Sequence, residues 1–139
     1  MMRFLILLGT PSITLLALIA GHRLFSRRER AALLWFAAAT SLVLYGGTLG
    51  YLPFDVYRLG FSPWAPVILA TLAIAAAPRS LPLALTALAA LVAYDIPLFR
   101  SVNLFDYVVD PIVGIVAIVW TAYTAFRTAI NFSANIPAS

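Results

Sequence analysis

The sequence predicts an all-α integral membrane protein, a polytopic bundle of about five transmembrane helices that forms a single transmembrane domain over residues 1–139. Of the 139 residues, 63% are hydrophobic and 10% are charged, and the mean hydropathy is +1.00. This composition leaves too little polar surface for a water-soluble domain of this size. Long apolar segments alternate with short polar connections, which is typical of membrane-spanning helices rather than of a membrane β-barrel.

The residue types that are missing exclude several kinds of chemistry. The chain contains no cysteine, which excludes disulfides, thiolate metal sites and cysteine nucleophiles.

All nine basic residues are arginine. Because these arginines lie at the ends of apolar segments, we expect them to orient the chain and to contact anionic lipid headgroups. Nucleic acid is therefore not an expected partner.

The first apolar segment covers residues 4–21 and is followed at once by the arginine-rich stretch 22–30. A secretory signal would end in a cleavage site of small residues, so this pattern favours a retained membrane helix. Pro11 lies inside the segment. It predicts either a kink or a helix that begins there, with Thr10 as the cap and Pro11 as the first helical residue.

The second segment, residues 31–51, is the clearest predicted span, because its length matches the hydrocarbon core of about 30 Å. A polar connection follows over residues 53–62. Ser62 and Pro63 then form the pattern of a cap and a first-turn proline, which predicts the start of another helix.

Residues 78–82 interrupt the long apolar run 63–95 with the sequence Pro-Arg-Ser-Leu-Pro. As one helix this run would measure about 50 Å, far more than the bilayer core, so we expect a hairpin of two helices. Ser80 and Pro82 predict the start of the second one. If both cross the membrane, and the last segment spans residues 108–127, the protein has about five spans; the alternative is about three spans plus a re-entrant helical hairpin at 63–95.

The distribution of arginine predicts the orientation, because cytoplasmic loops are enriched in basic residues. The favoured topology places the N-terminus outside and the C-terminus in the cytoplasm, in a prokaryotic inner membrane. We then expect aromatic residues at the outer interface, namely Tyr51, Tyr57, Trp64, Tyr94 and Tyr107. The cytoplasmic arginines would be Arg23, Arg27, Arg28, Arg30, Arg79 and Arg127.

Most acidic residues then lie on the outer side, near the stretch 94–111. Asp106 and Asp110 are four residues apart, so on a continuous helix they would share one face and could bind a cation or transfer protons. The favoured interpretation is structural, because Asp110 followed by Pro111 is a typical helix start and Arg100 can pair with an acid. The candidate ion or ion-pair cluster is Asp55, Arg58, Asp95, Arg100, Asn103, Asp106 and Asp110.

Asp95 follows the predicted hairpin and precedes Pro97. If it is buried without a partner, it could carry a proton. The favoured alternative is an interfacial carboxylate paired with Arg58 or Arg100.

Two patterns of small residues predict helix–helix contacts. Gly46 and Gly50 form a small-xxx-small pair that would allow close approach of another helix, and Ala117, Thr121 and Ala125 recur every four residues in the last segment.

A patch of basic residues follows the first apolar segment. It is a candidate site for anionic lipid, or it serves only to determine the topology: Arg23, Arg27, Arg28 and Arg30.

No nucleophile–base pair, metal-ligand spacing or cofactor motif is recognisable, so no catalytic residue, cofactor or metal is predicted. The favoured hypothesis is a small non-catalytic membrane protein, an accessory or scaffold subunit that packs through its small-residue faces against a larger assembly or against itself. The alternative is a small transporter or channel component that moves protons, cations or lipid past the outer carboxylates. Expected partners are membrane lipids and a protein partner or further copies.

Overall fold

The computed structural model describes residues 11–134, and every regular element in this range is a helix, which confirms the predicted all-α class. By length and composition, Arg27–Thr48 and Pro111–Phe132 are long and apolar enough to cross a membrane. In chain order the elements are α2 (Ile13–Ala20), α3 (Arg27–Thr48), the 3₁₀ helix η1 (Val56–Phe61), α4 (Trp64–Ala76), α5 (Leu81–Asp95), α6 (Phe105–Val108) and α7 (Pro111–Ala134).

Helix α2 begins at Ile13, two residues after the Pro11 start that the sequence pattern indicates. Ser12, in extended conformation, is its N-cap and accepts a hydrogen bond from the Leu15 amide, so Pro11 lies before the helix. The Ser12 hydroxyl can accept a hydrogen bond from a free amide of the first turn, which the side chain of Pro11 cannot do. Thr10 and the preceding part of the first apolar segment lie outside the described residues.

Helix α3 starts before the predicted residue 31 because a capping box lies upstream of the apolar pattern. Ser26 accepts from the Glu29 amide, and the Glu29 carboxylate accepts from the Ser26 amide. The helix has 22 residues and is about 33 Å long. It ends at Thr48, and the chain turns at Gly50, whose φ of +80° lies in the left-handed region that favours glycine.

The interruption at residues 78–82 separates two packed helices, as predicted. Ser80 is the N-cap of α5 and accepts from the Leu83 amide, and Pro82 occupies the first turn. With 13 residues in α4 and 15 in α5, the two helices measure about 20 Å and 22 Å. Both are shorter than a hydrocarbon core of about 30 Å.

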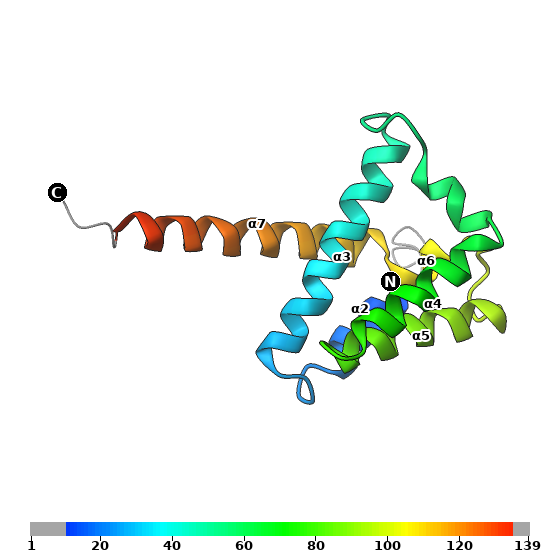
Figure 1. Ribbon diagram of the computed structural model, residues 1–139, viewed down its shortest axis with the longest axis horizontal. Coiled ribbons are helices and arrows are strands. Elements are labelled where there is room, and N and C mark those ends of the chain that lie inside the picture. Colours follow the sequence, from blue (N-terminus) through cyan, green and yellow to red (C-terminus); the bar gives the residue numbers. More distant parts are fainter. Residues whose placement is uncertain (1–10, 135–139) are drawn as a thin grey trace, which may run out of the picture.

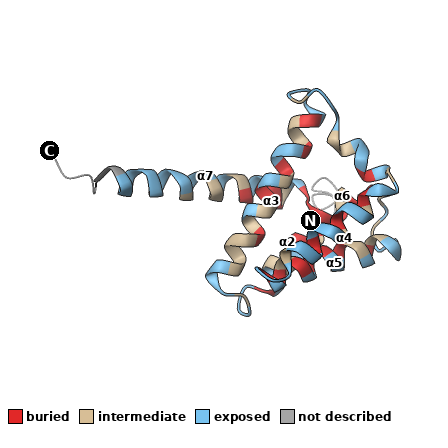
Figure 2. Cartoon of the chain, viewed as in Figure 1, coloured by how far each residue is buried: buried red, intermediate tan, exposed pale blue. Residues whose placement is uncertain are grey.

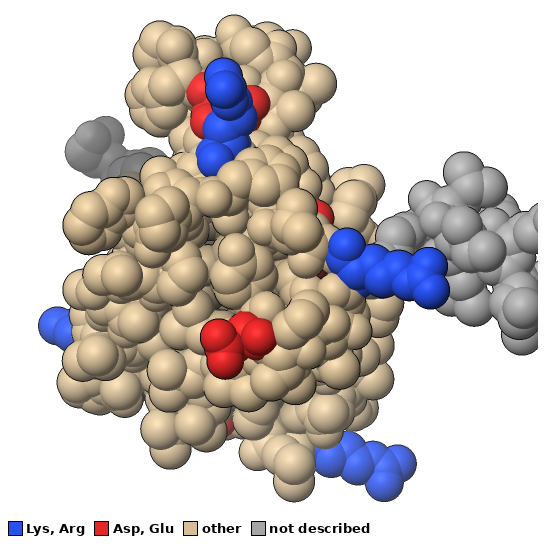
Figure 3. Space-filling view, turned by 90° about the vertical axis from the view of Figure 1, so that its right-hand side faces the viewer, with Lys and Arg blue, Asp and Glu red and all other residues tan. Residues whose placement is uncertain are grey.

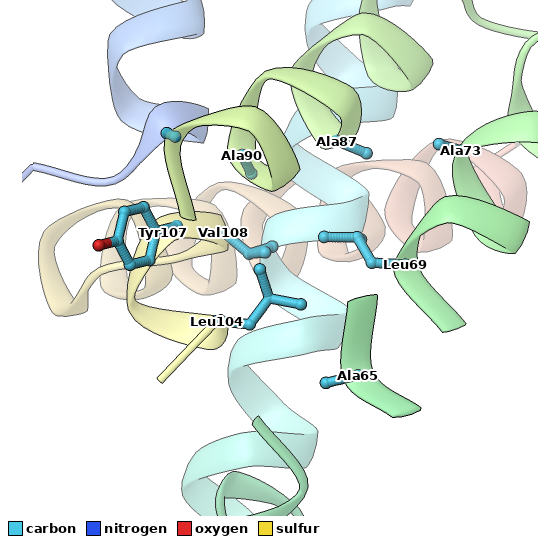
Figure 4. Packing of buried hydrophobic residues seen from close by; sticks show 9 residues of the cluster. Ala65, Leu69, Ala73, Ala87, Ala90, Leu104, Tyr107 and Val108 are labelled. Carbon is cyan, nitrogen blue, oxygen red and sulfur yellow. The ribbon is translucent and has the colours of Figure 1, made fainter. Parts of the chain in front are cut away.

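The core between α4, α5 and the segment around α6 is built mainly from alanine (Figure 4). Small side chains let the helices approach closely, and Leu69, Leu104 and Tyr107 fill the remaining volume. Tyr107 is fully buried, and its hydroxyl donates to the backbone carbonyls of Phe99 and Ser101. Its ring stacks on that of Phe99 at 5.0 Å.

Helix α7 packs against α3 near its start and then projects away from the other helices (Figure 1). Val113 and Ala117 are buried in a cluster that includes Ala37 and Ala38 of α3. Beyond this contact most of α7 is exposed (Figure 2). The described part of the chain therefore leaves most of this apolar helix uncovered.

Candidate functional site

Asp110 joins the starts of two helices. Its Oδ1 accepts hydrogen bonds from the amides of Ile112 (2.8 Å) and Val113 (2.9 Å), which caps α7. Its Oδ2 accepts from the amide (2.8 Å) and the hydroxyl (2.7 Å) of Ser12, the N-cap of α2. The predicted capping role of Asp110 is confirmed. With four donors satisfied and 3% exposure, this carboxylate is occupied by structural contacts.

Asp106 lies in a different environment, in the one-turn helix α6. Its Oδ1 accepts a hydrogen bond of 2.7 Å from the Tyr57 hydroxyl, and its Oδ2 accepts from the Ser101 hydroxyl. Both donors are neutral. The structure therefore gives Asp106 two hydroxyl partners in place of the arginine that the sequence analysis considered.

The Asp106–Tyr57 contact depends on how Asn103 ties η1 to the segment before α6. The Asn103 amide nitrogen donates to the Tyr57 carbonyl (2.9 Å), and its oxygen accepts from the Phe105 amide (2.9 Å). Gly60 allows this approach, because a β-carbon there would overlap the Asn103 side chain. Asn103 is 1% exposed, so its function is to hold the two segments together.

Burial, together with the hydrogen bond to Asp106, raises the pKa of Tyr57 to about 12. Tyr57 therefore keeps its proton at neutral pH and remains a donor to the carboxylate. This bond restricts the orientation of the Asp106 side chain.

Asp106 and Tyr57 line a cavity of about 280 Å³ where α3, η1, α6 and the start of α7 meet. Its walls are otherwise apolar or aromatic, apart from the Thr48 hydroxyl, which donates to the Leu44 carbonyl. We call it the Asp106 cavity. It is lined by Leu44, Tyr45, Thr48, Tyr57, Phe105, Asp106, Val109 and Pro111.

Asp106 and Asp110 do not share a helix face, because the helix breaks between them. Val109 is extended (φ −143°, ψ 135°) and ends α6. Pro111 disfavours the helical conformation in Asp110, the residue that precedes it, so α6 cannot continue into α7. The two carboxylates therefore belong to separate environments.

The remaining members of the predicted outer cluster are exposed. Asp55 caps η1 by accepting from the Tyr57 amide, and Asp95 ends α5. Neither is ion-paired with Arg58 or Arg100 in the part of the chain that the structure describes. Figure 3 shows charged side chains scattered over a face that is mostly uncharged. Among residues 11–134 no group of three or more His, Asp or Glu could hold a metal ion.

The basic patch lies at the start of α3 and is joined by the arginine of the hairpin turn. Arg28 and Arg79 line one open groove together with the cap residues Ser26 and Ser80. Arg30 instead donates to the His22 carbonyl at 2.6 Å, and Arg23 and Arg27 are exposed.

No helix of the described chain approaches Gly46 or Gly50 closely, so their predicted role in helix packing stays a prediction for a partner outside this chain. The nearest contact of a β-carbon at Gly46 would be the Leu52 side chain at 3.7 Å, and Gly50 has nothing within 4 Å, because it lies in the turn after α3. The close approach occurs instead at Gly114 of α7, where a β-carbon would lie 2.6 Å from Ser41 Oγ of α3.

Burial decreases along the small-residue stripe, because α7 projects away from the other helices (Figure 1). Ala117 is fully buried, whereas Ala125 is exposed. Thr121 lies between them, and its hydroxyl oxygen is buried without a hydrogen-bond partner among the described residues.

The sequence pattern does not indicate that Tyr45, Tyr57 and Phe105 line a common cavity. The position of Tyr57 in the sequence predicts an interfacial residue, and a single aromatic residue in a sequence does not indicate which distant carboxylate it contacts.

In comparisons with protein-family models, curated proteins and solved structures, none matches this chain.

Proposed function

We propose that this protein is a small, non-catalytic integral membrane subunit that packs laterally against another helical membrane protein through α7. The observation that carries the proposal is the exposure of α7. Ile115, Val119 and Phe126 are 62%, 62% and 65% exposed, in a helix that is apolar enough to lie in lipid. A helix that the described part of its own chain leaves uncovered is available to lipid or to a partner.

The two sides of α7 differ in a way that favours a partner on one of them. At about 100° per residue, the small side chains of Ala117, Thr121 and Ala125 follow one face. Helix contacts in membranes are enriched in small residues, and this face continues the contact that Ala117 makes with α3. Roughly opposite lie large apolar residues suited to lipid: Val116, Val119, Tyr123, Phe126 and Ile130.

For the topology, we propose that α3 and α7 cross the membrane and that the arginine end of α3 is cytoplasmic. Although α4 and α5 are each shorter than the hydrocarbon core, the groove shared by Arg28 and Arg79 supports a hairpin whose turn lies at that same end, which favours a cytoplasmic turn over a re-entrant turn inside the membrane. Because the chain has no cysteine, single Cys replacements test this cleanly. Leu24→Cys and Arg79→Cys should be protected from an impermeant maleimide in intact cells, and Leu98→Cys should be labelled; labelling of Arg79→Cys would contradict the topology.

The partner interface is tested by photo-crosslinking in the native membrane. A benzophenone amino acid at Ala125 should capture one stoichiometric membrane protein, and the same probe at Val119, on the opposite side of α7 and 62% exposed, should capture only lipid. Ala125→Leu should abolish co-purification in mild detergent, whereas the matched variant Val119→Leu should not. Adducts with lipid alone, or only with further copies of this chain, would contradict the proposal.

A further inference from the structure

The Asp106 cavity combines a carboxylate with a wall that supplies no compensating charge. Among the described residues that line the cavity, Asp106 is the only ionisable side chain apart from the tyrosines, and none is an arginine. Its two hydrogen-bond partners, the hydroxyls of Tyr57 and Ser101, are neutral. A carboxylate oxygen has about two acceptor positions, so each retains capacity toward a ligand.

Aromatic and aliphatic surfaces surround this carboxylate. Tyr45, Tyr57 and Phe105 supply rings that attract cations through their π faces, and Leu44 and Val109 supply aliphatic walls. The volume of about 280 Å³ is close to the lower end of small-molecule sites, which begin at roughly 300 Å³. A bound molecule would therefore meet one negative charge in an otherwise apolar enclosure.

These properties of the cavity favour one chemical class of ligand. An anion would be repelled, and a neutral molecule would leave the carboxylate without a counter-charge. Ca²⁺ or Mg²⁺ would require more oxygen ligands than one carboxylate and a few hydroxyls provide. We infer that the Asp106 cavity binds a singly charged organic cation that carries apolar groups, such as an aromatic quaternary ammonium.

The contact between Tyr57 and Asp106 orients the carboxylate before a ligand binds. Because Tyr57 remains protonated, its hydroxyl holds the carboxylate in position, and Asn103 fixes the backbone at Tyr57 from the opposite segment. This ligand site is separate from the α7 face, so loss of the partner interface by Ala125→Leu should leave cation binding unchanged.

The test uses the purified full chain in micelles of dodecyl maltoside, a nonionic detergent without an ammonium group, and benzyltrimethylammonium as the probe. We expect saturable binding of one cation per chain by calorimetry, and no binding of benzenesulfonate, which has the same ring and the opposite charge. Asp106→Asn should weaken the affinity at least about tenfold. The matched variant Asp95→Asn, which removes an exposed carboxylate, should bind like the wild type.

A second variant separates loss of charge from loss of folding. Thr48→Phe keeps Asp106 and its hydrogen bonds but places a ring at an exposed position of the cavity lining, so binding should also weaken. Both variants are first compared with the wild type by size-exclusion profile and thermal midpoint. Wild-type affinity in Asp106→Asn or in Thr48→Phe, equal losses in Asp106→Asn and Asp95→Asn, or the absence of saturable binding would overturn the inference.

Discussion

Ser12 and Asp110 are 98 residues apart in the sequence, and the Ser12 hydroxyl donates a hydrogen bond of 2.7 Å to Asp110 Oδ2. Each is also the cap of a helix, Ser12 for α2 and Asp110 for α7. Both side chains are buried, at 0% and 3% exposure. The start of the last helix is therefore fastened to the start of the first described helix by one carboxylate.

We predict that Asp110→Ala destabilises the protein by about 2 to 4 kcal/mol, because it leaves buried amide donors of two helices without an acceptor. Asp110→Asn should cost less, since one oxygen remains. The measurement is thermal unfolding in detergent, followed by the fluorescence of the three tryptophans. Asp55→Ala, which removes an exposed cap from η1, is the control and should cost less than about 1 kcal/mol. Equal costs at Asp55 and Asp110 would refute the buried junction.

At the crossing of α3 and α7, we predict that Gly114→Ala destabilises by about 1 to 3 kcal/mol through overpacking. The added methyl group would lie 2.6 Å from Ser41 Oγ and 3.2 Å from Ser41 Cβ. Ser41→Gly should therefore rescue most of the cost when the two changes are combined. A double-mutant cycle measured by thermal unfolding tests this, and strictly additive effects would show that the two positions are not in contact.

Substitutions at Gly60 and Gly46 form a matched pair that tests the close contact between η1 and the segment before α6. Gly60→Ala would force the added methyl group into Asn103, so we expect a cost of more than about 2 kcal/mol and a loss of the Tyr57–Asp106 contact. Gly46→Ala meets only ordinary contacts inside a helix and should be neutral or stabilising. Thermal midpoints of both variants give the comparison, and a harmless Gly60→Ala would contradict the described close approach.

The Tyr57 hydroxyl gives a prediction for alkaline pH. Its pKa is raised from 10.0 to about 12, so the folded state holds this proton more tightly than the unfolded state does. The stability that Tyr57 contributes is thus fully present below pH 10 and is lost as the pH rises through about 12. The difference in tyrosinate absorbance between the wild type and Tyr57→Phe should titrate near pH 12. A difference curve centred at pH 10 would show that the hydroxyl is not bound to Asp106.

Local signals in the sequence were sufficient to predict where a helix starts when the capping residue acts on its own helix. Ser80 with Pro82 predicted the start of α5, and Asp110 with Pro111 predicted the start of α7, because caps and first-turn prolines act within a few residues. The start of α3 was misplaced because the capping box at Ser26 lies upstream of the apolar pattern. Gly46 and Gly50 match a packing motif, yet no other helix of the described chain approaches them closely.

The sequence by itself determined the all-helical class, the strongly apolar character and the break between α4 and α5, because composition and capping are local properties of the chain. Only the tertiary structure decided what each polar group contacts. It separated Asp106 from Asp110 by an extended residue, joined Asp110 to Ser12, and enclosed Asp106 with Tyr57. Such pairings depend on how distant segments pack, and side-chain periodicity within one helix carries no information about the partner across the interface.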